Sequence, residues 1–366
     1  MEEYYREHLP KKWRPIYDQI KAWFISGISE ETDTRTLAFD GYIDGEDIMN
    51  IVRGVSSDHP ELMGVGPIKS GGGTIASFEY KNGGIEVSFR DADGRSYAYS
   101  KKECESIQSE TARIIEETVD SVIKKGLDEY HTILEFAKYI SENYRYLETP
   151  YGHDSSGLTI GRIVCEGVSH VFKRMCDKAG IWCIVVNGKA GNSKTPSKKW
   201  GEHAWNMVRL SNGNYYHIDV TWSMTSCLTG LNNIFTNEYT PKLYRYNYAF
   251  MSDRDVSATH QTDGWMVYPH CDDDSQEFYR KNGIIIRFND LFTKILNPEA
   301  IKALSFNGAR IVFARLMDSN GRVPSAAEVK MFSLAFVRRW LNERGNPDSE
   351  TYNEENGDYA YIVKEV

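Results

Sequence analysis

The sequence predicts an α+β protein made of three consecutive parts. Apolar residues recur with the helical period in some segments and with the two-residue period of strands in others. The length of 366 residues corresponds to roughly two or three domains. We expect a helical and β-meander domain over residues 1–128, a domain that packs a helix on an antiparallel sheet over residues 129–275, and a small α/β module over residues 276–366.

The N-terminal part combines helices with a meander. Apolar residues at helical spacing predict helices across residues 1–60. Over residues 75–100 the period changes to two, and glycine-rich turns separate the runs, which predicts a three-stranded meander. A polar amphipathic helix is expected over residues 101–126, where Gly126 is a natural stop.

The central part alternates helices and strands. Helices are predicted over residues 129–143 and from Glu166 to Ala179, with a loop over residues 150–161. Strands are predicted over residues 181–187, 204–210 and 215–222. The C-terminal part follows the order β-α-β-α-β, with its predicted elements over residues 283–288, 290–304, 309–313, 326–343 and 359–363.

Composition and charge exclude several classes of function. The net charge of −9 repels phosphate backbones, so we expect no nucleic-acid partner. No stretch approaches the ~18 apolar residues of a spanning helix, and no signal peptide is visible. We expect a cytoplasmic location if Met1 is native, and an extracellular or cell-surface one if a leader was removed. No zinc, calcium or phosphate-binding motif occurs, so no cofactor or metal is predicted. Oligomeric state stays open.

Cys165 is the candidate nucleophile. A thiol becomes nucleophilic when its pKa falls, and a helix N-terminus or a neighbouring imidazolium lowers that pKa. Cys165 directly precedes the helical run from Glu166, where orphan backbone N–H groups could also hold an oxyanion. His203 and Asp219, 16 residues apart on either side of a predicted hairpin, are candidates for the imidazole and for the carboxylate that orients it.

The hairpin register decides whether His203 and Asp219 can meet. Strand side chains alternate between the two faces of a sheet. If Asn212-Gly213 forms a two-residue turn, His203 lies opposite Trp222, and Asp219 falls on the other face.

A longer hairpin loop gives the opposite result. With Ser211-Asn212-Gly213 as the loop and its glycine left-handed, Leu210 pairs with Asn214. Asp219 then becomes a same-face diagonal neighbour of His203, within side-chain reach. A His203–Asp219 pair therefore predicts a three-residue loop or an equivalent bulge.

Three motifs carry a resemblance to a known family. Val164-Cys165-Glu166-Gly167, His203-Ala204-Trp205-Asn206 and Asp219-Val220-Thr221-Trp222 resemble the transglutaminase-like superfamily of cysteine enzymes, in its bacterial multidomain form. The core resemblance covers roughly residues 130–225. It implies a papain-like core, with the cysteine on a helix that packs on an antiparallel sheet. It also implies a nucleophile at Cys165, a base and acid at His203 and an orienting carboxylate at Asp219.

Other motif positions are expected to support the site or to alter its cleft. Trp222, Trp205 and Gly167 are expected to support the three central residues, and Trp222 to shield the His–Asp bond from water. Family members commonly have an aromatic residue where this chain has Val168, and an aspartate where it has Ser223. Weaker resemblance extends to two outer segments, Asp58-His59-Pro60-Glu61 and Phe250-Met251-Ser252-Asp253 with the following His260.

The remaining histidines and buried cysteines receive structural interpretations. His217 is expected at the surface or behind the site, and His59 and His260 are expected to cap or pack. Cys176 and Cys183 are predicted core residues.

The triad is compatible with several reactions on a protein or peptide substrate. Water as the acyl acceptor gives a peptidase or amidase, which we favour because water is always available. A lysine amine gives a cross-linking transglutaminase, and hydrolysis of a glutamine-derived thioester gives deamidation. The alternative class is a peptide- or glycan-binding module that keeps the fold without turnover. A further alternative is a scaffold whose flanking parts bind partners at a cell envelope.

Overall fold

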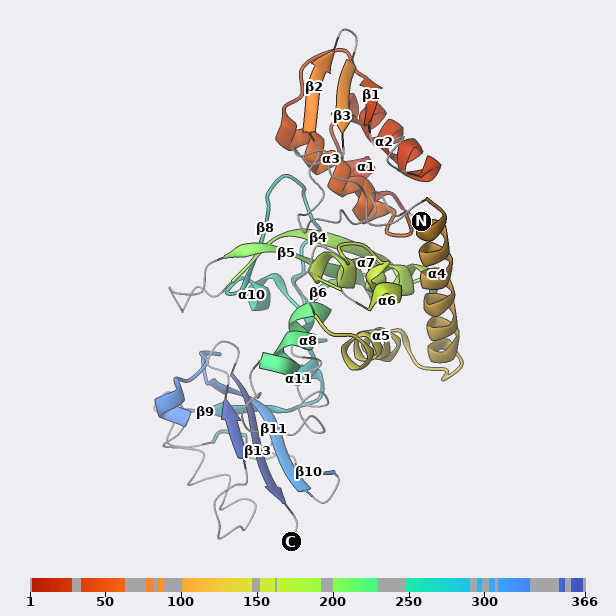
Figure 1. Ribbon diagram of the computed structural model, residues 1–366. Coiled ribbons are helices and arrows are strands. Elements are labelled where there is room, and N and C mark those ends of the chain that lie inside the picture. The colour runs from red at the N-terminus through yellow and green to blue at the C-terminus, as the bar shows by residue number, and fades with distance from the viewer. Residues whose placement is uncertain are drawn as a thin grey trace.

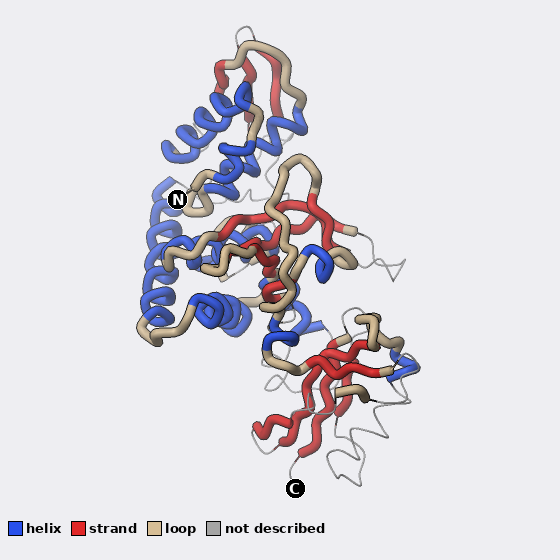
Figure 2. The backbone as a smooth tube through the Cα atoms, turned by 180° about the vertical axis from the view of Figure 1, so that it is seen from behind, coloured by secondary structure: helices blue, strands red, loops and turns tan. Residues whose placement is uncertain are grey.

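Three regions follow one another along the molecule in the computed structural model. In Figure 1 the N-terminal elements (red and orange) lie above a central sheet (green), and the C-terminal strands (blue) lie below it. Figure 2 shows from behind that helices gather around the central sheet, whereas the C-terminal region is mostly strand. The structure describes residues 2–27, 34–62, 77–81, 84–88, 101–146, 152–161, 163–191, 200–229, 246, 248–289, 295–297, 303–306, 309–329, 349–352 and 357–364.

The N-terminal region packs helices against a small antiparallel sheet of order β1-β3-β2. The prediction of helices across residues 1–60 is wrong for one segment, which forms β1 beside β3. That segment carries β-branched Thr34 and Thr36 and buries Leu37, as an edge strand does. The third strand predicted after residue 90 lies outside the described residues. The elements are α1 (Tyr4–His8), η1 (Lys11–Trp13), α2 (Arg14–Ser26), β1 (Thr34–Ala38), α3 (Gly45–Asp58), β2 (Ser77–Lys81) and β3 (Gly84–Ser88).

The central region is built on a five-stranded antiparallel sheet in the order β7-β6-β5-β4-β8. Helices predicted from periodicity are present, and the one over residues 129–143 has the predicted bounds. The strands are β4 (Cys183–Ala190), β5 (Gly201–Arg209), β6 (Tyr215–Ile218), β7 (Ala249–Met251) and β8 (His260–Thr262). The helices are α4 (Lys101–Ile123), α5 (Glu129–Asn143), α6 (Gly157–Ile160), α7 (Cys165–Lys178), α8 (Val220–Thr229), α10 (Asp253–Val256) and α11 (Phe278–Lys281).

Separate hydrophobic clusters cover the two faces of the central sheet. Strand side chains alternate, so Cys183 of β4 and Val208 of β5 join a cluster with α4, α5 and α7. The adjacent Ile184 and Met207 join a second cluster with α1, α2 and α3. The sheet is therefore held on both faces, which gives the side chains at its edges a rigid support. Cys176 and Cys183 are buried in the first cluster, as predicted.

The C-terminal region is a second mixed sheet in the order β10-β11-β13-β12, with β9 parallel to β11. The predicted helix over residues 290–304 is wrong at its end, because β10 begins at Ala303, and residues 290–294 and 298–302 lie outside the described residues. Of the helix predicted over residues 326–343, only 326–329 are described, and they are helical. The strands are β9 (Ile285–Phe288), β10 (Ala303–Phe306), β11 (Ala309–Asp318), β12 (Ser349–Tyr352) and β13 (Asp358–Lys364).

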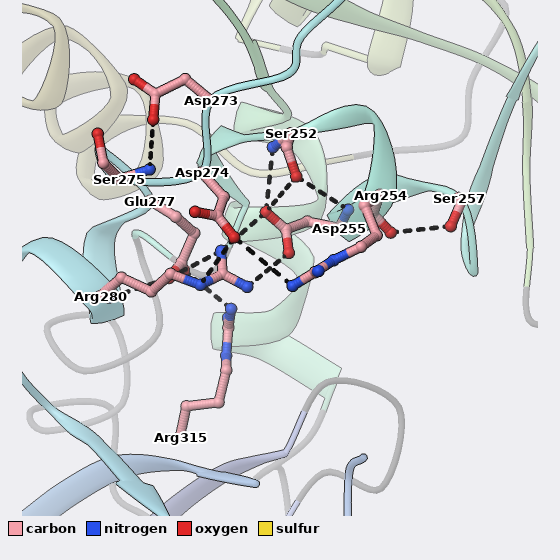
Figure 3. A network of polar contacts seen from close by, with 10 residues as sticks. All are labelled: Ser252, Arg254, Asp255, Ser257, Asp273, Asp274, Ser275, Glu277, Arg280 and Arg315. Atoms are coloured by element: carbon pink, nitrogen blue, oxygen red, sulfur yellow. Dashed lines mark hydrogen bonds and ion pairs between the residues drawn. The ribbon is translucent and has the colours of Figure 1, made fainter. Parts of the chain in front are cut away.

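A buried polar network joins the C-terminal sheet to the central region. Figure 3 shows Arg315 extending from β11 towards Glu277, and the two form an ion pair of 2.8 Å with both side chains almost fully buried. Arg280 makes two hydrogen bonds to Asp255 of α10, at 2.8 and 2.9 Å. This network connects α10, which lies beside β6 and β7, with the C-terminal strands. The boundaries at residues 128 and 275 stay predictions. Among the described residues, no helix is long and apolar enough to cross a membrane.

We expect Glu277→Gln to destabilise the protein by about 3 kcal/mol, because breaking a buried ion pair leaves the partner's charge buried without its counter-charge. Arg315 would lose that carboxylate. Urea unfolding of the full chain measures the loss. Glu110→Gln, in the exposed pair with Arg113, is the control and should leave the midpoint unchanged. Equal midpoints for both variants would contradict a stabilising role for the buried pair.

Candidate active site

Cys165 is the first residue of α7, so its thiol lies at the positive end of that helix. The preceding residue, Val164, is extended, and its backbone N–H donates to Gly152 O (3.2 Å). Val164 has no side chain that could cap the helix, so the first-turn N–H groups receive no bond from the cap position. Cys165 itself is half-buried. The helix start therefore offers a half-buried cysteine and nearby backbone donors.

Gly167 lets the loop before α7 approach the helix closely. A Cβ at this position would lie 2.1 Å from Gly152 O and 2.8 Å from Asp154 O. No real side chain tolerates such distances, so only glycine fits here. Gly167 therefore lets the loop pack against the first turn of α7, the turn that begins at Cys165.

The hairpin between β5 and β6 has the longer of the two loops considered above. Leu210 N donates to Asn214 O (3.1 Å), and Gly213 is left-handed at φ 86°. The pairing of Met207 with His217 continues the same register. The prediction of a three-residue loop is confirmed, and this register brings the chain after β6 back towards His203.

Asp219 lies between β6 and α8, which begins at Val220, so the predicted strand over residues 215–222 is wrong beyond Ile218. Asp219 Oδ1 accepts from Trp222 N (2.9 Å), and its backbone oxygen accepts from Ser223 N (3.2 Å). These bonds make Asp219 the cap of α8, a role that aspartate performs well. Val220 and Thr221 are residues that favour strands. They are helical here because the Asp219 carboxylate bonds to the backbone of its own chain and starts the helix.

His203 and Asp219 are brought together with Cys165. His203 Nε2 lies 2.7 Å from Asp219 Oδ2, and the thiol of Cys165 is close enough to the His203 ring to raise the pKa of that ring. Because Nε2 is engaged by the carboxylate, Nδ1 is the nitrogen left for the thiol. The side chains of His203 and Asp219 are 7% and 0% exposed, so water hardly competes for their bond.

Burial and pairing act against each other on the pKa values of this pair. Burial lowers the pKa of His203, but the Asp219 carboxylate and the Cys165 thiol outweigh it and raise that pKa to about 10. Burial raises the pKa of Asp219, yet the charge and hydrogen bond of His203, together with His260, hold it well below its usual range. His203 is thus held as an imidazolium beside the Cys165 thiol near neutral pH.

His260 is a site residue that sequence reasoning placed among capping or packing histidines. It begins the edge strand β8, and its Nε2 lies 2.9 Å from Asp219 Oδ2. Its Nδ1 faces Thr259 Oγ1 at 2.8 Å. The outer resemblance of the segment before His260 was the available signal, but only the pairing of β8 with β4 brings this residue to Asp219.

Aromatic side chains enclose the cluster. The Trp205 ring lies 6.0 Å from that of His203 at an interplanar angle of 17°, and Trp222 lies 5.9 Å from it. Trp222 and Trp205 also pack on His260, at 4.9 and 5.0 Å. Tyr248 adds a ring at 6.0 Å from His260. Apolar walls of this kind exclude water and strengthen the hydrogen bonds within.

His217 supports Trp205 from behind. Trp205 Nε1 donates to His217 Nδ1 (3.0 Å), and His217 Nε2 lies 2.9 Å from Asp253 Oδ1. Since an indole N–H can only donate, His217 Nδ1 must accept and Nε2 must carry the proton. His217 is buried, so of the two predicted places it takes the one behind the site. His59, by contrast, lies between Glu3 and Glu61.

Groups with metal-ligating atoms do occur among the described residues. A metal on His217 Nε2 would move the ring proton to Nδ1, against the Trp205 N–H, so that group does not fit a metal with its present partners. In the group around Asp219, both histidines already donate to the carboxylate. The three groups are His203, Asp219 and His260; His217, Asp253 and Cys271; and Asp253, His270 and Asp272.

We expect Gly167→Ala to destabilise the protein by about 1–3 kcal/mol and to slow alkylation of Cys165, because the new methyl group must displace the loop at Gly152. Thermal unfolding and the rate of iodoacetamide labelling measure the two effects. Gly201→Ala is the control, since a Cβ there meets open space. A wild-type melting temperature in Gly167→Ala would show that the loop packs less tightly than described.

Two known proteins resemble a short part of this chain in sequence. Kyphoscoliosis peptidase from Mus musculus and from Homo sapiens is 36% identical to this chain over 80 residues, which is 21% of this chain. The aligned stretch is 11% of the length of each of those relatives.

Two solved structures resemble the chain at low identity. A structure described as a TGase is 16% identical and covers 57% of this chain and 55% of its own, with a TM-score of 0.26. A proposed cysteine protease from Cytophaga hutchinsonii is 13% identical and covers 42% and 65%, with a TM-score of 0.25. The family model described as Transglutaminase-like superfamily matches residues 116–220, which hold Cys165, His203 and Asp219. Residues 116–220 are therefore a transglutaminase-like domain.

Proposed function

We propose that this protein is a cysteine-dependent acyl-transfer enzyme that acts on amide or peptide bonds through Cys165, His203 and Asp219. One observation carries the proposal. The His203 imidazole bonds to a fully buried carboxylate at 2.7 Å, and the thiol of Cys165 acts on the same ring from the start of α7. This is the nucleophile, base and orienter arrangement that acyl transfer requires. The match of residues 116–220 to the Transglutaminase-like superfamily supports the same class.

Acylation is the first half of the proposed reaction. The sulfur of Cys165 attacks the carbonyl carbon, an S–C bond forms, and the carbonyl oxygen becomes an oxyanion. The His203 imidazolium then gives its Nδ1 proton to the leaving nitrogen, and the C–N bond breaks. The products are an amine and a thioester on Cys165. Asp219 holds Nε2–H of His203 throughout, so the ring keeps its orientation.

Deacylation returns the enzyme to its first state. His203, now neutral at Nδ1, takes a proton from the acceptor as the acceptor attacks the thioester carbonyl. The C–S bond breaks and leaves the thiolate of Cys165 beside the restored imidazolium. The N–H groups at the start of α7 lie next to the sulfur, and the N–H of Cys165 is the proposed donor to the oxyanion in both halves.

Water is the acceptor that we favour, which makes the protein a peptidase or amidase. The 36% identity over 80 residues to a protein named as a peptidase supports this choice. A lysine amine as acceptor would make the protein a cross-linking transglutaminase, and a glutamine-derived thioester hydrolysed by water would make it a deamidase. The non-enzymatic alternative is a peptide- or glycan-binding module that retains the fold without turnover.

We expect Cys165 to be the fastest alkylated cysteine at pH 6, because the adjacent imidazolium favours the reactive thiolate. The rate with anionic iodoacetate should fall as pH rises through about 10, where His203 loses its proton. Peptide mass spectrometry of each labelled cysteine measures both effects. Cys176, Cys183 and Cys271 are internal controls, since they are buried. His203→Ala should abolish the fast reaction.

Slow alkylation of Cys165 would favour the binding module over the enzyme. If Cys165 reacts no faster than the partly exposed Cys104 at pH 6, the thiolate–imidazolium pair does not form and the catalytic proposal fails.

We expect casein incubated with the protein to gain new amino termini, and Cys165→Ala to lose this activity by at least about 1000-fold. The same reactions should contain a fluorescent primary amine and an ammonia assay. Amine incorporation would identify a cross-linking enzyme, and ammonia release without incorporation would identify a deamidase. Cys104→Ala is the control, because that residue lies on α4 and contacts none of the three central side chains through a described bond.

A further inference from the structure

The proposed reaction uses His203 and Asp219 but leaves His260 without a role. This residue is fully buried, comes from a different strand, and bonds to the same carboxylate oxygen as His203. The two rings lie 5.6 Å apart. A second histidine on the orienting carboxylate is more than packing requires, because a buried apolar side chain would fill the same space.

The hydrogen bonds of His260 fix which nitrogen carries its proton. Asp219 Oδ2 accepts, so His260 Nε2 must donate at 2.9 Å. Nδ1 is then the acceptor for the hydroxyl of Thr259 at 2.8 Å, a shorter contact than the 3.3 Å from the same hydroxyl to Val256 O. Burial lowers the pKa of His260, although Asp219 acts in the opposite sense, so the ring is neutral near pH 7. His260 thus contributes a hydrogen bond to Asp219 without adding a charge.

Asp219 Oδ2 therefore accepts hydrogen bonds from two donors. His203 Nε2 approaches it at 2.7 Å and His260 Nε2 at 2.9 Å, while Oδ1 is used by the backbone of Trp222. Three donors from three parts of the chain leave the carboxylate no free direction in which to rotate. Two donors on one oxygen also compete, because each withdraws electron density from the other's bond.

We infer that His260 is a positioning residue: by sharing Oδ2 of Asp219 with His203, it holds the carboxylate in place and limits how strongly that carboxylate retains the His203 proton. The inference rests on the proposed function of the triad. Its chemical purpose follows from acylation, in which His203 must surrender a proton to the leaving nitrogen. An imidazolium that is held too strongly is a poor acid, and catalysis is best when the acid's pKa lies near the working pH.

The groups that act on this pair come from several elements. Cys165 of α7 and Asp219 at the β6–α8 junction face His203, and His217 of β6 acts weakly on His260. The rings of Trp205, Trp222 and Tyr248 complete the surroundings and bring no charge. Loss of the His260 hydrogen bond should therefore affect His203 chiefly through the change at Asp219.

The test compares His260→Leu with His260→Gln in the full chain, with iodoacetate as the probe. Leucine removes the donor, whereas the amide of glutamine can place an N–H near the former Nε2. We expect the pH at which Cys165 labelling falls to rise by about half a unit to one unit in His260→Leu, since Asp219 then serves His203 alone. His260→Gln should return it most of the way to the wild-type value.

Three results would overturn the inference. An unchanged profile in His260→Leu would leave His260 as packing only, and a downward shift would mean that His260 strengthens the hold of Asp219 on the His203 proton, which is the opposite of the limit inferred. Equal shifts in the leucine and glutamine variants would trace the effect to volume. His59→Leu is the matched control, since its ring also bonds to carboxylates, those of Glu3 and Glu61, but not to Asp219. It should leave the profile unchanged.

A measurement on the wild-type protein covers the case in which His260→Leu does not fold. Nitrogen-15 NMR of labelled histidines distinguishes ring tautomers, and we expect His260 to be neutral with its proton on Nε2 at pH 7. A proton on Nδ1, or a charged ring, would overturn the inference. The failure of the proposed function looks different, because wild-type Cys165 would then show no fast labelling at pH 6, whatever the tautomer of His260.

Discussion

The buried carboxylate of Asp219 is the group on which the site depends. It caps α8, accepts from His203 and accepts from His260, so the helix start and both imidazole rings are positioned by one side chain. A buried charge is stable only when it is paired and hydrogen-bonded, and here three donors meet that requirement. The same bonds that stabilise the charge also orient the ring that faces Cys165.

The central sheet provides the rigidity that this arrangement needs. Helices α4, α5 and α7 cover one face of the sheet, and the N-terminal helices cover the other, so β5 and β6 are packed on both sides. A site built on such a support keeps its side chains within narrow limits. The N-terminal region therefore supports the sheet that carries the site, although it contributes none of the three central side chains.

Much of the fold could be predicted from periodicity, and the exceptions have local causes. Long amphipathic helices such as α5 and α7 follow their apolar spacing closely, because one face of each is buried. The strand at Thr34–Ala38 was hidden, since it has a single buried residue, Leu37, and pairs with a strand distant in sequence. The end of β6 was also misjudged, because a side-chain cap overrode the strand preference of its sequence.

The sequence by itself supplied the candidate nucleophile, base and carboxylate, because Cys165 precedes a helical pattern, one of two hairpin registers lets Asp219 reach His203, and three motifs together resemble the transglutaminase-like superfamily. Only the tertiary structure decided that His260 joins the same carboxylate, and that Gly167 makes room for a loop. Those contacts depend on strand pairing and close packing between segments far apart in the chain, for which one-dimensional periodicity carries no signal.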